Sequence, residues 1–275
     1  MKNKKPTVAI AASAYNEEGN IKNFLESVIR QKQGEFILEK ILIISDGSTD
    51  KTVDIARSMK HNKLEVKEYK TRAGKSTRLN EIYQGLKSDI LIQTDCDVIF
   101  EGPYVVRDMV RALSKNDGVG MSGGNSIPLE ATSFVEKAIN YTHATFVGFR
   151  HSVRGQHNMF SVDGRILGFK RELVKKINVP TDMITNDIYT YFCCVANKYD
   201  YRFASSAIVR FRSPQTLEDH IAQNTRYMAA KARMKRYFGN ELVDREFHIP
   251  KPFFDTGYVV SVHKRSYLVF FYLFS

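Results

Sequence analysis

Short apolar runs alternate with amphipathic stretches over the first 95 positions of this 275-residue chain. Runs of this kind are typical of buried strands, and the stretches between them carry apolar residues at helical spacing. The pattern predicts strands over 7–13, 39–45, 63–69 and 89–95, and helices over 21–31, 51–59 and 76–86. Positions 41–44 and 90–92 are continuously apolar, as in strands covered by helices on both faces. We therefore expect an α/β fold with a mostly parallel sheet flanked by helices.

Beyond residue 116 the alternation is less regular. A strand-like segment with flexible glycines covers 118–128, a helical segment covers 131–149, and a second strand-like segment covers 161–170. The chain has no internal repeat, no low-complexity tract and no long linker. The simplest division is one composite domain over 1–240, with basic amphipathic helices near its end, followed by a tail over 241–275.

Composition narrows the class of protein. With 43% hydrophobic and 26% charged residues the chain is globular, and its length allows a core without disulfides. Its three cysteines, Cys96, Cys193 and Cys194, indicate a reducing compartment, and its short first apolar run does not resemble a signal peptide. The formal charge of +11 fits a nucleic acid, an anionic membrane or a phosphate-bearing substrate as partner, as well as a merely solvated basic surface.

Acidic residues follow three of the predicted strands. Glu17 and Glu18 come after the first strand, Asp46 and Asp50 follow the second, and Asp95-Cys96-Asp97 ends the fourth. Ligands of open parallel sheets bind outside the carboxyl ends of the strands. We therefore expect these acids to meet at one edge of the sheet and to form the binding site.

The pair Asp95 and Asp97 is the strongest metal candidate. Alternation along an extended chain places residues two apart on the same side. Two carboxylates, completed by substrate phosphates and water, suit Mg²⁺ or Mn²⁺. A simple turn in which Asp97 caps the next segment is the alternative. Asp46, at a strand tip before Gly47, is placed to accept hydrogen bonds from a base or a ribose.

A third motif precedes the helix over 76–86. Arg72, Gly74 and Lys75 resemble the end of a phosphate-binding P-loop, but 68–71 contain no glycine, which disfavours a Walker-type ATPase. Arg72 and Lys75 remain suitable counter-charges for a diphosphate.

Taken together, these motifs resemble the GT-A-fold family 2 glycosyltransferases. The resemblance covers the first hundred residues and rests on Ala14-Tyr15-Asn16-Glu17, on 45–50, on Gly74-Lys75 and on 95–97. It implies that 1–115 form a nucleotide-binding half and 116–240 an acceptor and catalytic half. It also implies that Ala14, Tyr15, Asn16, Glu17, Asp46, Gly74, Lys75 and Asp95 bind the donor, and that Asp95 and Asp97 hold the metal.

Two motifs of the second half extend the resemblance. Thr185-Asn186-Asp187 is similar to a Thr-Glu-Asp signature, which implies that Asp187 is the general base; an ordinary residue in a first helical turn is the alternative. Gln223, Arg226 and Tyr227 are similar to the Gln-x-x-Arg-Trp signature of the membrane-associated synthase branch, which implies a role in donor binding. Asn186, Tyr227 and Ser45 each replace the residue that is usual in these signatures.

The resemblance implies a metal-dependent, inverting hexosyltransferase of polysaccharide biosynthesis. The expected donor is a nucleotide-diphosphate sugar, first a UDP-sugar and second a GDP-sugar, and the expected acceptor is a glycan or a lipid-linked hydroxyl. The alternative is a basic nucleotide- or nucleic-acid-binding protein without sugar chemistry, although phosphate backbones avoid clustered carboxylates, so we expect no nucleic acid partner. A nucleotidyltransferase is disfavoured because no Gly-rich loop follows Ile10.

The C-terminal segment bears on location. Residues 267–274 are nearly all apolar and follow a basic cluster, His263-Lys264-Arg265. Eight residues are too few to cross a bilayer, which needs about 20. The segment is a truncated membrane helix, an interfacial anchor or a buried element. The basic flank favours the cytoplasmic side of a membrane, reached through this tail.

Overall fold

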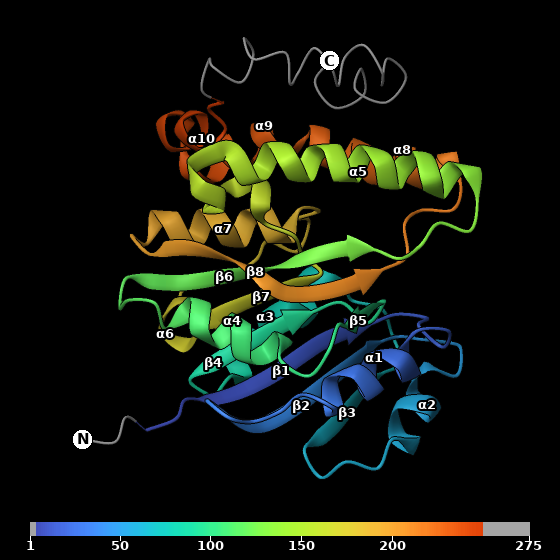
Figure 1. Cartoon of the computed structure of the whole chain (residues 1–275). Coiled ribbons are helices and arrows are strands. Elements are labelled where there is room, and N and C mark those ends of the chain that lie inside the picture. The colour runs from blue at the N-terminus through green and yellow to red at the C-terminus, as the bar shows by residue number, and fades with distance from the viewer. Residues whose placement is uncertain (1–3, 250–275) are drawn as a thin grey trace. The chain divides into compact units, whose positions relative to one another are not determined.

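The computed structural model describes residues 4–249 (Figure 1). The chain divides into two compact units that are interleaved in sequence. The first unit comprises residues up to Ile127 and Val162–Arg212, and the second comprises Pro128–Ser161 and the part of the chain from Ser213. The functional boundary near residue 115 stays a prediction, since this division concerns packing alone.

The first unit is built on one eight-stranded sheet with the order β3-β2-β1-β4-β7-β6-β8-β5 (Figure 1). Its strands are β1 (Thr7–Ala14), β2 (Ile37–Asp46), β3 (Leu64–Tyr69), β4 (Ile90–Thr94), β5 (Val98–Phe100), β6 (Val119–Pro128), β7 (Ile166–Lys170) and β8 (Asp200–Phe211). The α/β fold expected from the hydrophobic pattern is confirmed.

Strand direction changes in the middle of the sheet. The pairs β1 with β2, β1 with β4, and β2 with β3 are parallel, as the alternation of strands and helices predicts. The pairs β4 with β7, β6 with β7, and β5 with β8 are antiparallel. The carboxyl ends of β1, β2 and β4 therefore share one edge, where the three acidic motifs lie.

Helices cover both faces of this sheet. Val8, Ile10 and Ala12 of β1 belong to a core cluster shared with α1 (Ile21–Ile29) and α4 (Val105–Leu113). The helix α2 (Thr52–Ser58) adds the buried Ala56 and the partly buried Ile55. The other face of β1 and β2 contacts α3 (Lys75–Gly85). On that face Tyr83 donates its hydroxyl to Gln93 Oε1 at 2.5 Å. Burial on both faces explains why β4 is apolar along most of its length.

Two more helices complete the first unit. The short α6 (Arg171–Val174) follows β7 directly, and α7 (Asn186–Ala196) packs against β8. α7 is almost entirely buried, which agrees with its apolar and aromatic sequence. Its first turn carries the Thr-Asn-Asp motif.

The second unit is helical in its described part. It contains α5 (Phe134–Ser152), the 3₁₀ turns at Val153–Gln156 and Met159–Ser161, α8 (Leu217–Met228), α9 (Ala230–Phe238) and α10 (Asn240–Glu246). Before α8 the Asp219 amide donates to Thr216 Oγ1 at 3.1 Å, and Thr216 Oγ1 donates to Asp219 Oδ2 at 2.7 Å, so Thr216 caps this helix. Arg154 ties the 3₁₀ turn to α10 through Glu246, with Nη1 2.8 Å from Oε2.

Within residues 4–249, no helix combines the length and the apolar character needed to cross a bilayer. The apolar run at 267–274 and the basic cluster before it, on which the expected membrane contact rests, lie outside the described residues.

Candidate functional site

The loops that follow β1 and β2 are joined by side-chain hydrogen bonds. Asn16 has a left-handed backbone (φ 55°), its amide donates to Ser48 Oγ, and its Oδ1 accepts from the Thr49 amide at 2.9 Å. The Glu17 amide donates to Thr52 Oγ1 at 2.7 Å. A short polar side chain tolerates the left-handed region, which accounts for an asparagine at this turn. The two loops therefore form one ordered rim, on which Tyr15 is exposed.

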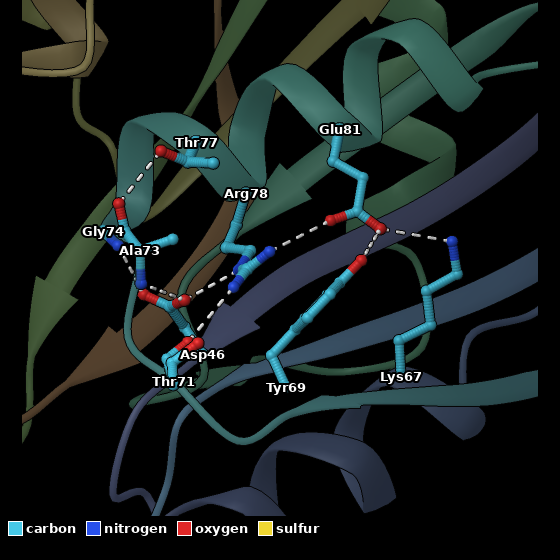
Figure 2. A network of polar contacts seen from close by, with 9 residues as sticks. All are labelled: Asp46, Lys67, Tyr69, Thr71, Ala73, Gly74, Thr77, Arg78 and Glu81. Atoms are coloured by element: carbon cyan, nitrogen blue, oxygen red, sulfur yellow. Dashed lines mark hydrogen bonds and ion pairs between the residues drawn. The ribbon is translucent and has the colours of Figure 1, made fainter.

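Asp46 lies buried at the tip of β2, and three donors already occupy its carboxylate (Figure 2). Oδ1 accepts from the Ala73 amide at 2.9 Å and from Arg78 Nε at 2.7 Å, while Oδ2 accepts from the Gly74 amide at 2.8 Å. Burial alone would raise the pKa of Asp46, but these donors hold it below its ordinary value. That Asp46 contacts a nucleotide base stays a prediction. What the structure shows is an ionised carboxylate that holds the loop before α3.

Lys75 and Asp95 form an ion pair at the same edge, with Nζ 2.5 Å from Oδ1. Lys75 is the first residue of α3, and Asp95 follows β4 directly. Desolvation favours the neutral amine, yet the carboxylates of Asp95, Asp187 and Asp97 raise the pKa of Lys75. The lysine therefore stays cationic and links the two predicted metal ligands to the predicted base.

The Asp95-Cys96-Asp97 motif alternates as expected. Cys96 is buried in the core, whereas Asp97 is exposed and Asp95 is partly exposed. Partial desolvation and then repulsion from Asp95 raise the pKa of Asp97, against the attraction of Arg165 and Lys75. Both carboxylates thus lie close enough to repel each other on one side of the chain.

Glu17 adds a third carboxylate to this region. Partial burial raises the pKa of Glu17 in spite of the hydrogen bond from Asn20, and the nearby charges of Asp97 and Asp95 raise it further. The acids at the ends of β1 and β4 therefore meet, as the parallel topology predicts.

Asp187 lies in the first turn of α7. Thr185 is the N-cap residue of this helix, and the Ile188 amide donates to Asp187 Oδ1 at 2.9 Å. A side chain on Gly164 would begin 3.4 Å from Asp187 Cβ, so the loop before β7 lies directly against this carboxylate. Burial, more than any charge, raises the pKa of Asp187, and Asp163 adds to the effect while Lys75 opposes it. A carboxylate with a raised pKa is suited to accept a proton.

α3 also anchors the segment that leads to Asp187. Asn80 Nδ2 donates to the Val179 carbonyl at 2.7 Å, and the Val179 amide donates back to Asn80 Oδ1 at 2.8 Å. Ser76 Oγ lies 3.1 Å from the Met183 carbonyl oxygen and 3.0 Å from Asn186 Oδ1. One helix therefore carries Lys75 and fixes the approach to the predicted base.

The loop before β7 contributes charged residues that the sequence analysis does not single out. Arg165 pairs with Asp163 at 3.0 Å and stacks on Phe211, with its guanidinium carbon 3.6 Å from the ring centre. Its carbonyl oxygen accepts from the Asp95 amide at 3.2 Å. An Asp-Gly-Arg triplet directly before a buried strand was the available signal.

The predicted site residues thus fall into two groups. The first unit brings together most of them, namely Ala14, Tyr15, Asn16, Glu17, Asp46, Gly74, Lys75, Asp95, Asp97 and Asp187. Gln223, Arg226 and Tyr227 lie on α8 of the second unit. The geometry of the site is therefore that of the first unit alone.

Asp95 and Asp97 are the residues that could hold a metal ion. Among residues 4–249, no three His, Cys, Asp or Glu side chains are grouped so as to form a complete protein metal site. Repulsion between the two carboxylates favours a cation between them, and hard divalent cations accept a site with few protein ligands when phosphates and water supply the rest. The donor set therefore fits a divalent ion bound together with a phosphate-bearing ligand.

Family models match most of the chain. The model for glycosyl transferase family 2 matches residues 9–178, and that for glycosyl transferase family group 2 matches residues 94–274. The first match includes the acidic motifs at the ends of β1, β2 and β4, and the second includes Asp187 and α8.

Known proteins resemble the chain at low identity. The poly-β-1,6-N-acetyl-D-glucosamine synthase of Staphylococcus epidermidis is 24% identical over 247 residues, which are 87% of this chain and 56% of the relative. The chain thus spans little more than half the length of that relative.

Solved structures share the fold. A mannosyltransferase from Pyrobaculum calidifontis, in complex with GDP-Man and Mn²⁺, matches with a TM-score of 0.66 and 18% identity over 98% of this chain and 73% of that one. Glucosyl-3-phosphoglycerate synthase from Mycobacterium tuberculosis, in complex with Mn²⁺, UDP and phosphoglyceric acid, matches with a TM-score of 0.59 and 16% identity. This match covers 84% of this chain and 78% of that one. At these identities the likeness concerns the fold.

Proposed function

The chain belongs to glycosyl transferase family 2, and from that membership we propose that it transfers a sugar from a nucleotide-diphosphate sugar to a hydroxyl group. The acceptor in this proposal is a glycan or a lipid-linked saccharide. One observation of the structure carries it: Lys75, Asp95, Asp97 and Asp187 converge at the edge of the sheet where α/β proteins bind ligands.

Asp187 acts as the general base of an inverting single displacement. The acceptor oxygen bonds to C1 of the sugar as the bond from C1 to the diphosphate oxygen breaks, and the hydroxyl proton passes to Asp187. The base must approach from the side opposite the leaving group, so it has to be a carboxylate separate from the metal pair. Asp187 fits because burial raises its pKa and because it enters the edge from α7, not from β4.

Basic side chains stabilise the leaving diphosphate. Lys75 is held cationic beside Asp95. Arg72 lies on the loop that leads into α3, with its guanidinium carbon 3.9 Å from the ring centre of Tyr15. Fixed positive charge at the atoms where negative charge develops lowers the barrier. Gln223, Arg226 and Tyr227 complete donor binding in this proposal, which for them rests on their motif alone.

Asp97, with Asp95 in support, would hold a divalent ion, Mn²⁺ or Mg²⁺. The carboxylate pair suits such an ion, and the named structural neighbours contain Mn²⁺. When bound, the ion supplies charge neutralisation to the diphosphate. The other steps belong to the side chains of this chain: Lys75 orients the phosphates and Asp187 receives the proton.

The relatives suggest which donors to try first. The synthase relative is named for a polymer of N-acetylglucosamine, and the neighbours are complexed with GDP-Man or UDP. We place a UDP-sugar first and a GDP-sugar second. Polysaccharide synthesis is the setting that fits the name of this relative. In this proposal it takes place at the cytoplasmic side of a membrane, which rests on the basic and apolar C-terminal sequence alone.

A thermal-shift panel tests the donor site. UDP, GDP, CMP and ADP are each measured with and without Mn²⁺ or Mg²⁺, on the wild type and on Asp97→Ala. We expect one diphosphate to raise the melting temperature only with the metal, and this shift to be lost in the variant. Glu101→Ala, which removes an exposed acid outside the Asp95-Cys96-Asp97 motif, is the matched control and should keep the shift.

A transfer assay then separates sugar chemistry from simple binding. UDP-N-acetylglucosamine, UDP-glucose and GDP-mannose are incubated with glycan and lipid-linked acceptors, and the released diphosphate is quantified. Release that requires both acceptor and metal supports the proposal. Salt-sensitive binding to DNA or RNA, with no response to any nucleotide sugar, would contradict the proposed sugar transfer and support a nucleic-acid-binding protein. Family membership does not favour that alternative.

A further inference from the structure

Arg78 is a buried cation on the α3 face that packs against the sheet. Its side chain is 7% exposed and that of Asp46, to which it is bonded, is 5% exposed. Taking two charges out of water is costly, and one such pair seldom stabilises a fold more than apolar residues of the same size would. Stability alone therefore does not explain why Asp46 and Arg78 are paired at the edge of the sheet where the predicted binding site lies.

The guanidinium of Arg78 is fixed on several sides (Figure 2). Its central carbon lies 3.5 Å from the ring centre of Tyr69, and Nη1 is 3.5 Å from Glu81 Oε2. Glu81 is itself held by the Tyr69 hydroxyl at 2.9 Å and by Lys67 Nζ at 3.3 Å. Arg78 thus has one available position, and that position presents Nε to Asp46.

The backbone of 71–74 is the element that this pair holds. Asp46 accepts the amides of Ala73 and Gly74, and Thr77 Oγ1 donates to the Ala73 carbonyl oxygen at 2.9 Å (Figure 2). Arg78 Nη2 also lies 3.4 Å from the Thr71 carbonyl oxygen. The loop is therefore fastened to the tip of β2 and to the first turns of α3 at the same time.

Gly47 shows how closely the loop approaches β2. Its φ is +76°, and a Cβ built there would lie 2.7 Å from the Arg72 amide nitrogen. Only glycine fits both the left-handed backbone and this contact. The loop carrying Arg72 and leading into Lys75 is thus seated directly on the residue that follows Asp46.

We propose that Asp46 and Arg78 are positioning residues which clamp the loop 71–74, so that Arg72 and Lys75 meet the diphosphate of the donor in a fixed arrangement. This proposal rests on the proposed function. It gives Asp46 a task besides the predicted contact with the nucleotide base, because its two oxygens already accept from the Ala73 and Gly74 amides and from Arg78 Nε.

The clamp has a measurable signature. A loop that is ordered before binding loses less conformational freedom when the ligand arrives, so releasing it weakens affinity for the group that the loop contacts. That group is the diphosphate and not the base. Loss of the clamp should therefore affect a nucleoside diphosphate strongly and the matching nucleoside little.

Arg78→Met tests this, with Arg57→Met as the matched control. Arg57 lies on α2 in an exposed ion pair with Glu68, so the control makes the same substitution outside the clamp. Dissociation constants are measured for UDP with Mn²⁺, or for the diphosphate selected by the panel, and for its nucleoside. We expect Arg78→Met to weaken diphosphate binding tenfold or more and nucleoside binding less than twofold, and Arg57→Met to change neither.

Three further readouts complete the test. Arg78→Lys, which keeps the charge without the planar fork, should recover part of the affinity. Hydrogen exchange of the peptide covering 71–75 should speed up in Arg78→Met while other segments keep their protection. The KM for the donor should rise while kcat changes less than threefold. If Arg78→Met does not fold, Asp46→Asn is measured in its place, because its side chain has nearly the same shape as that of the wild type. The expected results are the same loss of diphosphate affinity and the same faster exchange over 71–75.

The outcomes distinguish the two proposals. The clamp is overturned if Arg78→Met binds the diphosphate as well as the wild type does, or if it loses equal affinity for diphosphate and nucleoside. The proposed function still stands in that case, provided that the wild type binds the donor and transfers the sugar. A wild type that binds no nucleoside diphosphate with metal overturns both.

Discussion

Asp187 shows how the environment of one residue can fit it for chemistry at the expense of stability. Burial raises its pKa above the ordinary value of 3.8, which means that the folded protein holds its proton more tightly than the unfolded chain does. Above that raised pKa the ionised, partly buried carboxylate destabilises the fold. The same ionised form is the one that a general base requires.

Asp187→Asn should therefore lose activity and gain stability. Without a proton acceptor, transfer at saturating donor should fall by about 10²–10⁴-fold. Because this variant removes a partly buried charge, the melting temperature at pH 7 should rise. Initial rates and thermal unfolding check the two effects. Asp117→Asn, which changes an exposed acid before β6, should change neither. Full transfer by Asp187→Asn would remove Asp187 from the role of base.

The pH dependence follows from the direction of the shift. As pH falls through the raised pKa of Asp187, the carboxylate takes up a proton and kcat should decline, at a pH above 3.8. Over the same range the stability gap between Asp187→Asn and the wild type should close, because protonation removes the buried charge. Rate profiles and melting temperatures recorded from pH 4 to 8 test both. A gap that widens toward low pH would contradict the assigned direction.

At the scale of elements, α3 organises the site. Lys75 begins the helix, Arg78 holds the loop before it, and Asn80 holds the segment before α7 through two hydrogen bonds to Val179. The helix thus connects residues assigned to the donor side with the segment that carries the proposed base.

Asn80→Ala tests the second connection. Val179 is buried, so its amide and carbonyl would lose partners, and unfolding free energy should fall by about 1–3 kcal/mol. We expect kcat to decrease because the segment carrying Asp187 loosens, while donor affinity stays within twofold. Chemical denaturation and steady-state kinetics provide the measurements. Gln84→Ala, at an exposed position of the same helix, serves as control. If Asn80→Ala changed donor affinity alone, Asn80 would not have the assigned role of holding the segment that carries Asp187.

Sequence patterns predicted those elements whose signal is local. The strands β1 to β4 and helices α1 to α3 are recognisable from continuous apolar runs and helical spacing, and the parallel topology then predicts where Asp95, Asp97 and Glu17 meet. β8 was not predicted, because Ser205 and Ser206 interrupt its alternation of buried residues. The pairing of Asp46 with Arg78 was out of reach, since it depends on how α3 packs over β2.

The whole molecule combines a strong positive charge with an apolar C-terminal sequence. The formal charge of +11 attracts an anionic surface at low salt, and aromatic and aliphatic residues can enter the interface of a bilayer. Both features are properties of the sequence, and the membrane contact that we propose rests on them.

Vesicle sedimentation tests this contact. The full chain should bind vesicles containing anionic lipid at low salt and bind zwitterionic vesicles less, because charge contributes to attraction. Raising the salt to about 0.5 M should weaken the binding without abolishing it if the apolar tail enters the membrane. Phe270→Ser combined with Phe271→Ser should remove the remaining part. Equal binding to both lipids, or none, would contradict the proposed membrane setting.

The placement of Lys75 and Asn80 on one continuous helix has a mechanical consequence. Lys75, the proposed cation for the leaving group, begins α3, and Asn80, which holds the segment carrying the proposed base, lies about one and a half turns further along. A shift of α3 along its axis, or a rotation about that axis, would displace Lys75 and Asn80 together. A substitution that moves α3 to admit a bulkier donor should therefore also displace the segment that carries Asp187, and so impair proton removal from the acceptor. Donor and acceptor preferences would then have to evolve together.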